Sequence, residues 1–213
     1  MYIYLKFGSL NNMTDLLKNG TIYCNPISEF AKLDDSCRND KDELTTMMEY
    51  SGNTILFLSE DRDFKNPIIV DLKNTRYKEF VIKPVGNLFC LFTLDFKNTP
   101  DDHTITLDEQ LKEFGTHVVL INDSNEFAKR VVNQLNMDGI QFKHGKIGYK
   151  DFSKYTGKKS FFSKDLKYSY QNEYRLHLLT AKNEPYKINI GSIEDIAVLM
   201  ETKDIKSIRK RNL

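Results

Sequence analysis

The residues best suited to chemistry lie in the segment 168–175, which reads Tyr-Ser-Tyr-Gln-Asn-Glu-Tyr-Arg. In an extended strand, Gln171, Glu173 and Arg175 point to the same face, because successive side chains alternate between the two faces. Charged side chains are rarely buried without partners. This face therefore either meets solvent as the polar side of an edge strand or lines a polar cleft, and both interpretations stay open. The opposite face is apolar and is expected to pack on the core: Tyr174, Leu176 and Leu178.

Other sequence signatures of catalysis are missing from the chain. It has no GxGxxG or GxxxxGK[ST] phosphate loop, no GxSxG nucleophile elbow and no HExxH zinc motif. A cluster of carboxylates offers oxygen ligands for magnesium, which keeps a magnesium-dependent nuclease as a third hypothesis. Since acidic loops are mostly solvated, we expect no metal. The cluster consists of Asp34, Asp35, Asp40, Asp42 and Glu43.

A basic, aromatic stretch at residues 154–167 supports a different function. Lysines meet phosphates and aromatic rings stack on bases in proteins that bind single strands. A nucleic-acid-binding or non-catalytic module is therefore the alternative to an enzyme, although an ordinary exposed loop explains the same residues. They are Lys154, Tyr155, Lys158, Lys159, Phe161, Phe162, Lys164 and Lys167.

Composition sets the limits for these hypotheses. The 213 residues, 40% of them hydrophobic, suffice for one domain spanning residues 1–213 with its own core. A net charge of +1 excludes the strongly basic signature of a dedicated duplex-DNA binder. Three separated cysteines favour neither disulfides nor zinc. The chain starts without a signal-peptide pattern and has no apolar run of about 20 residues, so we expect a cytoplasmic protein without membrane contact.

The elements that must position these residues begin with a strand, a helix and a second strand. Residues 2–7 are rich in aromatic and branched side chains, as in strands. Apolar residues then recur at helical spacing up to Asn19-Gly20, a left-handed helix stop. Residues 21–24 form the second strand, and Gly8-Ser9 lies in the turn before the helix. The helical residues are Leu10, Met13, Leu16 and Leu17.

The rest of the chain alternates strand-like pieces with loops. Strands are predicted at residues 54–59, 67–72, 77–83, 88–95, 116–121 and 173–180, and an amphipathic helix runs through residues 127–135. Residues 34–49 are predicted to be a polar loop, solvated or facing a substrate, and residues 151–167 a long exposed loop. Strands outnumber helices, which predicts an α+β domain.

A resemblance to the ADP-ribosyltransferases rests on two of these segments. Gln171-Asn-Glu173 is similar to the Gln-x-Glu motif that one branch of these enzymes carries on a late strand. The opening, residues 5–9 followed by a helix, Gly20 and a strand, resembles their start. Polymerase-like members often have His-Gly-Thr at this turn, whereas this chain has Phe7-Gly8-Ser9, and Lys6 takes the place of the arginine of toxin-like members.

The resemblance implies a fold and a set of roles. It implies two small, mostly antiparallel sheets with flanking helices, NAD as co-substrate in the cleft between them, and a macromolecular acceptor. Glu173 would be the catalytic carboxylate that stabilises positive charge on the ribose, and Gln171 would orient the acceptor or the ribose. The implied NAD-binding residues are Lys6, Gly8 and Ser9 at the nicotinamide end, Arg38 at the pyrophosphate, and Arg175.

The chain also resembles a group of bacterial proteins of unknown function, over residues 4–175. The shared segments are 25–30, 38–40 with Glu43, 87–91 and 168–175. This group suggests a setting in bacterial defence or conflict with phages.

Overall fold

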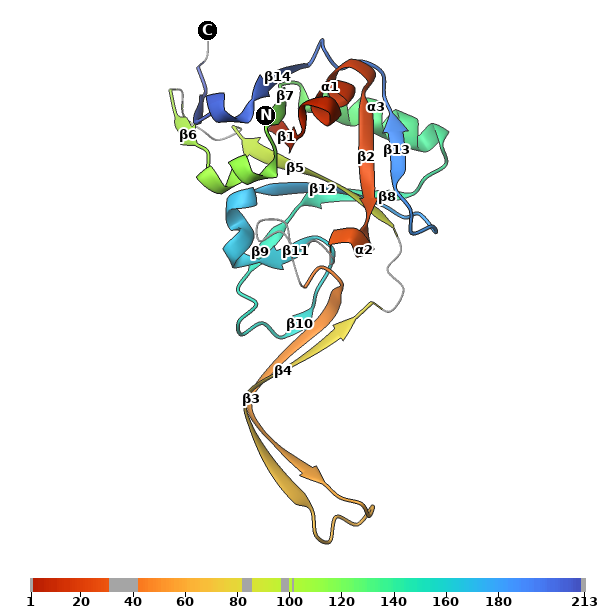
Figure 1. The fold of residues 1–213 in the computed structure, drawn as a ribbon, viewed down its shortest axis with the longest axis vertical. Helices are drawn as coiled ribbons and strands as arrows, with labels where there is room; N and C mark the ends of the chain where they lie inside the picture. The colour runs from red at the N-terminus through yellow and green to blue at the C-terminus, as the bar shows by residue number, and fades with distance from the viewer. Residues whose placement is uncertain (1, 31–41, 82–85, 97–99, 101, 212–213) are drawn as a thin grey trace.

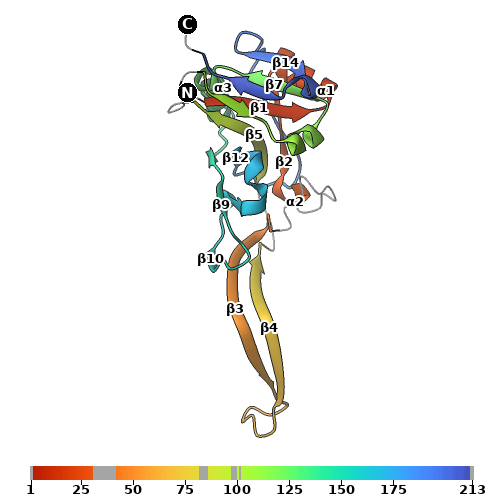
Figure 2. The same cartoon turned by 90° about the vertical axis from the view of Figure 1, so that its left-hand side faces the viewer.

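The computed structural model describes residues 2–30, 42–81, 86–96, 100 and 102–211. It confirms a mixed α+β protein in which strands outnumber helices and the sheets are mostly antiparallel. A body with one large sheet carries a long two-stranded ribbon that projects from it (Figures 1 and 2). No helix in these residues has the length and apolarity needed to cross a membrane.

The predicted strand–helix–strand opening is confirmed. It consists of β1 (Tyr2–Gly8), α1 (Leu10–Asn19) and β2 (Thr21–Pro26). Ser9 caps the helix, because its hydroxyl accepts a hydrogen bond from the Asn12 amide. Gly20 ends it in the left-handed conformation, with φ of 64°, and donates its N–H back to the last turn. Local sequence signals thus fix both ends of α1.

The main sheet has eight strands in the described part of the chain, and β5 (Asn87–Asp95) lies at its centre. One arm of the sheet continues through β1 to β7 (His117–Ile121) and β14 (Ala197–Glu201). A second continues through β2 to β13 (Tyr186–Asn189), and a third through β12 (Glu173–Leu178) to β8 (Phe142–Lys146). Every pair in this sheet is antiparallel.

The sheet forks along one edge of β5. β12 occupies one edge from Asn87 to Phe92. On the other edge, β1 pairs as far as Leu5 opposite Phe92, and β2 pairs only from Asn25 opposite Leu88. Since a strand has two edges, β1 and β2 share one and diverge across residues 89–91. This divergence opens the sheet next to the turn that contains Gly8.

Apolar side chains pack on both faces of the sheet. Helices α1 and α3 (Ser124–Met137) cover one face and bury a large cluster that includes Leu16, Phe127 and Leu176. A smaller cluster on the other face is centred on Leu5 and Phe96. Its neighbours are η1 (Glu109–Phe114) and a ribbon of β6 (Thr104–Thr106) with β15 (Ser207–Arg209), which adds Ile105 and Ile208.

Two loop predictions are wrong. Of the polar loop expected at residues 34–49, residues 34–41 lie outside the described residues, and residues 45–49 instead belong to β3 (Thr45–Leu58), which pairs with β4 (Ile68–Phe80) in the long ribbon. The long exposed loop expected at residues 151–167 contains β10 (Gly157–Lys158) and β11 (Ser163–Asp165), and Phe152 and Lys164 within it are buried. In both places, pairing with residues distant in the sequence orders a segment that lacks a local pattern.

Short elements complete the body around β12. β11 pairs in parallel with β9 (Gly148–Lys150), and β10 pairs with the base of β3. The turn η2 (Leu166–Gln171) leads directly into β12. Two further turns are α2 (Ile27–Phe30), which follows β2, and η3 (Thr202–Asp204), which follows β14.

Candidate functional site

A cavity of about 230 Å³ lies at the fork of the main sheet. β1 contributes Lys6 and Phe7, β5 contributes Cys90, and β12 contributes Glu173 and Arg175. An adjoining hollow of about 680 Å³ extends past the start of α1. The two spaces share five lining residues, and together they form what we call the fork cleft. The shared residues are Lys6, Phe7, Tyr23, Asn25 and Phe114.

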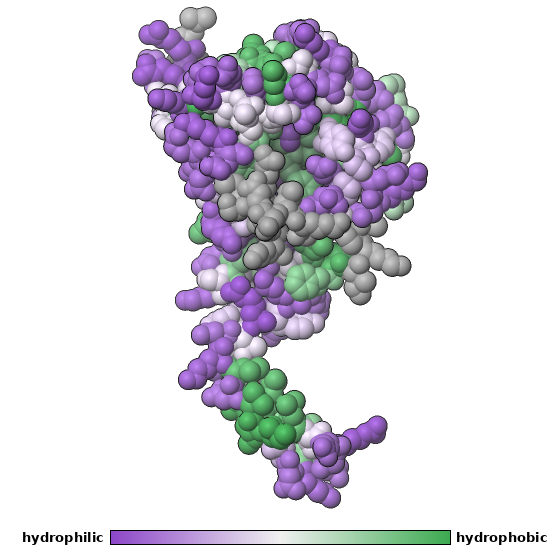
Figure 3. All heavy atoms as spheres, in the orientation of Figure 1, coloured by the Kyte–Doolittle hydropathy of each residue, from purple (hydrophilic) through white to green (hydrophobic). Residues whose placement is uncertain are grey.

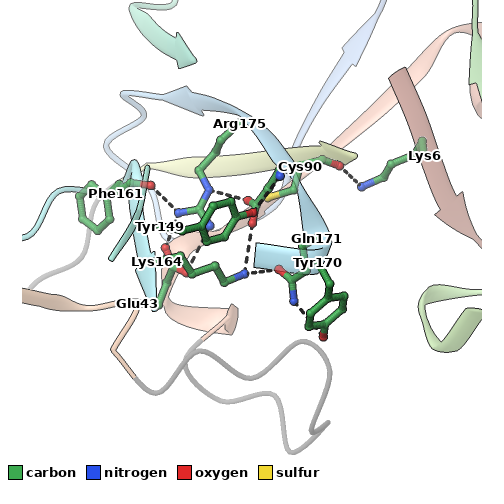
Figure 4. A network of polar contacts seen from close by, with 10 residues as sticks. Lys6, Glu43, Cys90, Tyr149, Phe161, Lys164, Tyr170, Gln171 and Arg175 are labelled. Carbon is green, nitrogen blue, oxygen red and sulfur yellow. Dashed lines mark hydrogen bonds and ion pairs between the residues drawn. The ribbon is translucent and has the colours of Figure 1, made fainter. Parts of the chain in front are cut away.

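Lys6 bridges the gap where β1 leaves β5. Its ammonium donates a hydrogen bond to the backbone carbonyl oxygen of Cys90 at 2.8 Å (Figure 4). The same ammonium lies 4.4 Å from the centre of the Phe89 ring. The carbonyl of Cys90 faces the divergence of the two strands, so the lysine supplies a donor there. Lys6 therefore both holds the fork and places a cation on the wall of the cleft.

Glu173 and Arg175 share one face of β12, as predicted, whereas Gln171 does not belong to this strand. Gln171 is the last residue of η2, and Asn172, with φ of 37°, turns the chain from this helix into β12. The side chain of Gln171 nevertheless reaches the same cavity. The opposite face is apolar as predicted, since Leu176 and Leu178 are buried in the core and Tyr174 packs against it.

β12 lies between β5 and β8 and is not an edge strand, and its polar face is buried because Glu43, Phe161 and Lys164 pack against it. Glu173 accepts hydrogen bonds from Arg175 Nε at 2.7 Å and from Lys164 Nζ at 3.1 Å. Arg175 also donates to Glu43 at 2.6 Å and to the carbonyl of Phe161 (Figure 4). Lys164 donates to the Gln171 amide oxygen at 2.7 Å. The interpretation as an edge strand facing solvent is therefore wrong.

These four ionic side chains, Glu43, Glu173, Arg175 and Lys164, form what we call the buried ionic network. Each is between 1% and 7% exposed. Two carboxylates balance two cations, so the network carries no net charge when all four groups are ionised. Burial by itself would strongly oppose such charges, and the paired geometry is what offsets that penalty.

The charges in the network hold each other ionised. Burial alone would raise the pKa of Glu173, but the Arg175 and Lys164 cations outweigh it, and the pKa lies well below the ordinary range. Burial likewise opposes the charge of Lys164, but the Glu173 carboxylate outweighs it and raises its pKa. Glu173 is therefore an anion at neutral pH, at a position that lines the fork cleft.

Two further groups next to Glu173 stay neutral. Burial, with the nearby Glu173 carboxylate, raises the pKa of the Cys90 thiol to about 12. Burial also raises the pKa of Tyr149 to about 12, and its hydroxyl accepts a hydrogen bond from the Glu173 amide at 2.9 Å. Neither group is a thiolate or phenolate nucleophile at neutral pH. The carboxylate is consequently the anionic group among these three.

The remaining residues of the implied NAD site have different positions. Gly8 ends β1 and lines the larger hollow together with Ser9, whose hydroxyl caps α1. Gly115 packs tightly on this turn, since a Cβ added to it would lie 2.4 Å from the Gly8 carbonyl oxygen. Arg38 lies outside the described residues. Lys6, Gly8 and Ser9 thus border the same fork cleft as Gln171, Glu173 and Arg175.

Sequence reasoning missed the partners of Glu173. The sequence places Lys164 in a candidate nucleic-acid-binding loop and Glu43 in an acidic cluster that offers ligands for magnesium, but in the structure both belong to the buried ionic network. Lys159 is also buried, which further weakens a surface built from that loop. Asp34, Asp35 and Asp40 of the acidic cluster lie outside the described residues, which themselves contain no group of side chains arranged to hold a metal ion. The sequence does offer one signal for these contacts, because cations such as Arg175 and Lys164 require acidic partners if they are buried.

Comparisons of the chain with protein-family models, with curated proteins and with solved structures give no significant match.

Proposed function

We propose that this protein is an ADP-ribosyltransferase-like enzyme that uses NAD to modify a macromolecular acceptor. The observation that carries the proposal is an ionised carboxylate, Glu173, on the wall of a cleft that opens where β1 and β2 diverge. The same cleft is bordered by the Gly8-Ser9 turn. A setting in bacterial defence, which the sequence resemblance suggests, is part of this proposal.

The lining of the fork cleft favours a nucleotide. The described residues around the smaller cavity include three cations, Lys6, Lys164 and Arg175, against the single carboxylate of Glu173. Lys164 and Arg175 are balanced by Glu173 and Glu43 within the buried ionic network, so Lys6 is the cation that this lining adds to a neutral network. A lysine cation on the wall suits a phosphate of a dinucleotide. Aromatic rings in the same lining suit stacking on the bases. They belong to Phe7, Tyr23, Phe30, Phe92 and Phe114.

The size of the cleft also favours an extended ligand. At about 230 Å³, the smaller cavity lies below the roughly 300–1,000 Å³ typical of ligand sites. The adjoining hollow of about 680 Å³ brings the combined space into that range. The nicotinamide end would enter the fork next to Glu173, and the rest of the dinucleotide would follow the start of α1.

In the proposed reaction, NAD supplies an ADP-ribosyl group, and the side chains of this chain position and stabilise it. Glu173 stabilises the positive charge that develops on the ribose as nicotinamide leaves, an electrostatic role for a preorganised group. Arg175 and Lys164 fix the orientation of that carboxylate from two sides. Gln171, held by Lys164, presents its amide on the same wall to the ribose or the acceptor.

Titration calorimetry with NAD, paired with an assay of ADP-ribose transfer to protein and nucleic-acid acceptors, tests the proposal. The double variant Lys164→Met/Glu173→Gln keeps the buried ionic network neutral while it removes the carboxylate. We expect this variant to bind NAD and to transfer at least about 100-fold more slowly than the wild type. If the wild type gives no binding heat at about 1 mM NAD, its free energy of NAD binding is weaker than roughly −4 kcal/mol. The proposed function is then wrong.

A further inference from the structure

The far end of the β3–β4 ribbon is apolar, although it lies away from the body. We call residues 54–58 and 68–72 the distal arm. Six of its large apolar side chains are between 41% and 68% exposed. Figure 3 shows them as a hydrophobic band on the ribbon, between the body and a hydrophilic tip. They are Ile55, Leu56, Phe57, Leu58, Ile68 and Ile69.

Both faces of the distal arm carry this apolar surface. Directly paired residues share a face, so Leu58 opposite Ile68 lies on one side and Phe57 opposite Ile69 on the other. An isolated two-stranded ribbon is only marginally stable in water. Apolar side chains that cover both of its faces are therefore unfavourable unless another surface packs against them.

The body holds only the near half of the ribbon. β10 pairs with β3 at Met47 and Met48. Tyr50 donates its backbone N–H to the Thr156 hydroxyl, and Arg76 donates to the Ser153 carbonyl oxygen. Beyond these contacts the ribbon extends away from the body in both views (Figures 1 and 2). The near half of the ribbon is thus fixed to the body, and the distal arm projects from it.

We propose that the distal arm is a dimerisation element, and that its partner is the distal arm of a second copy of this chain. A two-fold interface needs a surface that is complementary to itself. The distal arm meets this requirement because its two faces present the same kind of side chain. In the proposed dimer, the two strongly twisted ribbons wind around each other, so that each covers both faces of the other.

The area available is sufficient for a dimer. At roughly 100 Å² for each half-exposed large apolar residue, the six side chains expose roughly 600 Å² per copy. Two copies would bury roughly 1,200 Å² in total, which reaches the lower end of specific, stable interfaces.

The charges at the tip favour a protein partner over a lipid surface. The loop at residues 59–67 connects the two strands, and its five charged side chains are all exposed. Insertion of the distal arm into a bilayer would drag these charges into or through the apolar layer. Their opposite signs nearly cancel, so two arms do not repel each other strongly. The charged residues are Glu60, Asp61, Arg62, Asp63 and Lys65.

Sedimentation equilibrium of the full chain over a concentration series tests the proposal against the monomer mass of 24.9 kDa. We expect the wild type to be dimeric. The variant Phe57→Ser/Ile68→Ser removes one apolar side chain from each face and should weaken the dimer at least roughly tenfold, because each change occurs twice in the interface. The matched control Val198→Ser/Leu179→Ser changes apolar residues of similar exposure outside the distal arm and should leave the dimer intact.

Three results would overturn the proposal. They are a wild type that stays monomeric at every concentration, a dimer that the distal-arm variant leaves unchanged, and a monomer that sediments with phosphatidylcholine vesicles through the distal arm. Circular dichroism of both variants verifies that the body remains folded, which is expected because the changed side chains are exposed. The test is independent of NAD, so it separates this proposal from the proposed enzymatic function.

Discussion

Replacing Glu173 by Gln should lower the stability of the protein, in addition to any effect on catalysis. The change keeps the shape of the side chain, but it leaves Arg175 and Lys164 buried with only Glu43 as an anionic partner. Removing one partner of a buried ion pair typically costs about 3–5 kcal/mol. For a chain of this size that corresponds to a melting temperature lower by roughly 6–20 °C. A thermal melt and urea unfolding measure the loss.

The second half of this prediction restores the balance of charge. In Lys164→Met/Glu173→Gln, the remaining buried pair of Arg175 and Glu43 is again neutral. The double variant should therefore be more stable than the sum of the two single changes, by a coupling energy of about 1–3 kcal/mol. As a control, Glu201→Gln breaks an exposed surface pair with Lys203 and should leave stability nearly unchanged. Additive effects of the two buried changes would refute the network as a coupled unit.

Two other predictions follow from the same region. Because the pKa of Glu173 is held below its ordinary value of 4.5, its contribution to the free energy of unfolding should be complete above about pH 4.5 and decline as the pH falls further. Urea unfolding between pH 7 and pH 3 should show a steeper acid loss for the wild type than for Lys164→Met/Glu173→Gln, and equal losses would contradict this assignment. Gly115→Ala would push a Cβ into the backbone of Gly8, so it should lower stability by about 1–3 kcal/mol and weaken NAD binding. Gly148→Ala, whose Cβ meets nothing closer than 3.7 Å, is the control, and a Gly115→Ala protein as stable as that control would argue against tight packing on the turn.

The sequence predicts the parts of the fold whose signals are local. The ends of α1 follow from the Ser9 cap and the Gly20 stop, each within a few residues of the helix it limits. The alternation along β12 correctly predicts that Leu176 and Leu178 face the core. It also places Glu173 and Arg175 on one face, because the side-chain period of a strand is independent of what surrounds it.

Other features depend on pairing between distant residues, and the sequence alone leaves them open. A period of two cannot say whether the polar face of β12 is solvated or buried, since that depends on side chains from other segments, such as Glu43 and Lys164, that pack over it. The same alternation wrongly predicts that Gln171 lies in the strand. In the structure a left-handed turn at Asn172 separates Gln171 from β12. The apolar pattern of residues 54–58 predicts a strand, but not that it would extend into solvent.

The candidate site shows the same division. Alternation along the chain indicates Gln171 and Glu173 as candidate site residues, and the resemblance to the ADP-ribosyltransferases adds the Gly8-Ser9 turn. Only the tertiary structure brought them to one cleft, because β1 and β2 share an edge of β5 and must diverge there. Only the tertiary structure joined Glu43 to Arg175, 132 positions apart, and Lys164 to Glu173. Buried charges need partners at hydrogen-bonding distance, and those distances are set by the folded chain rather than by the order of its residues.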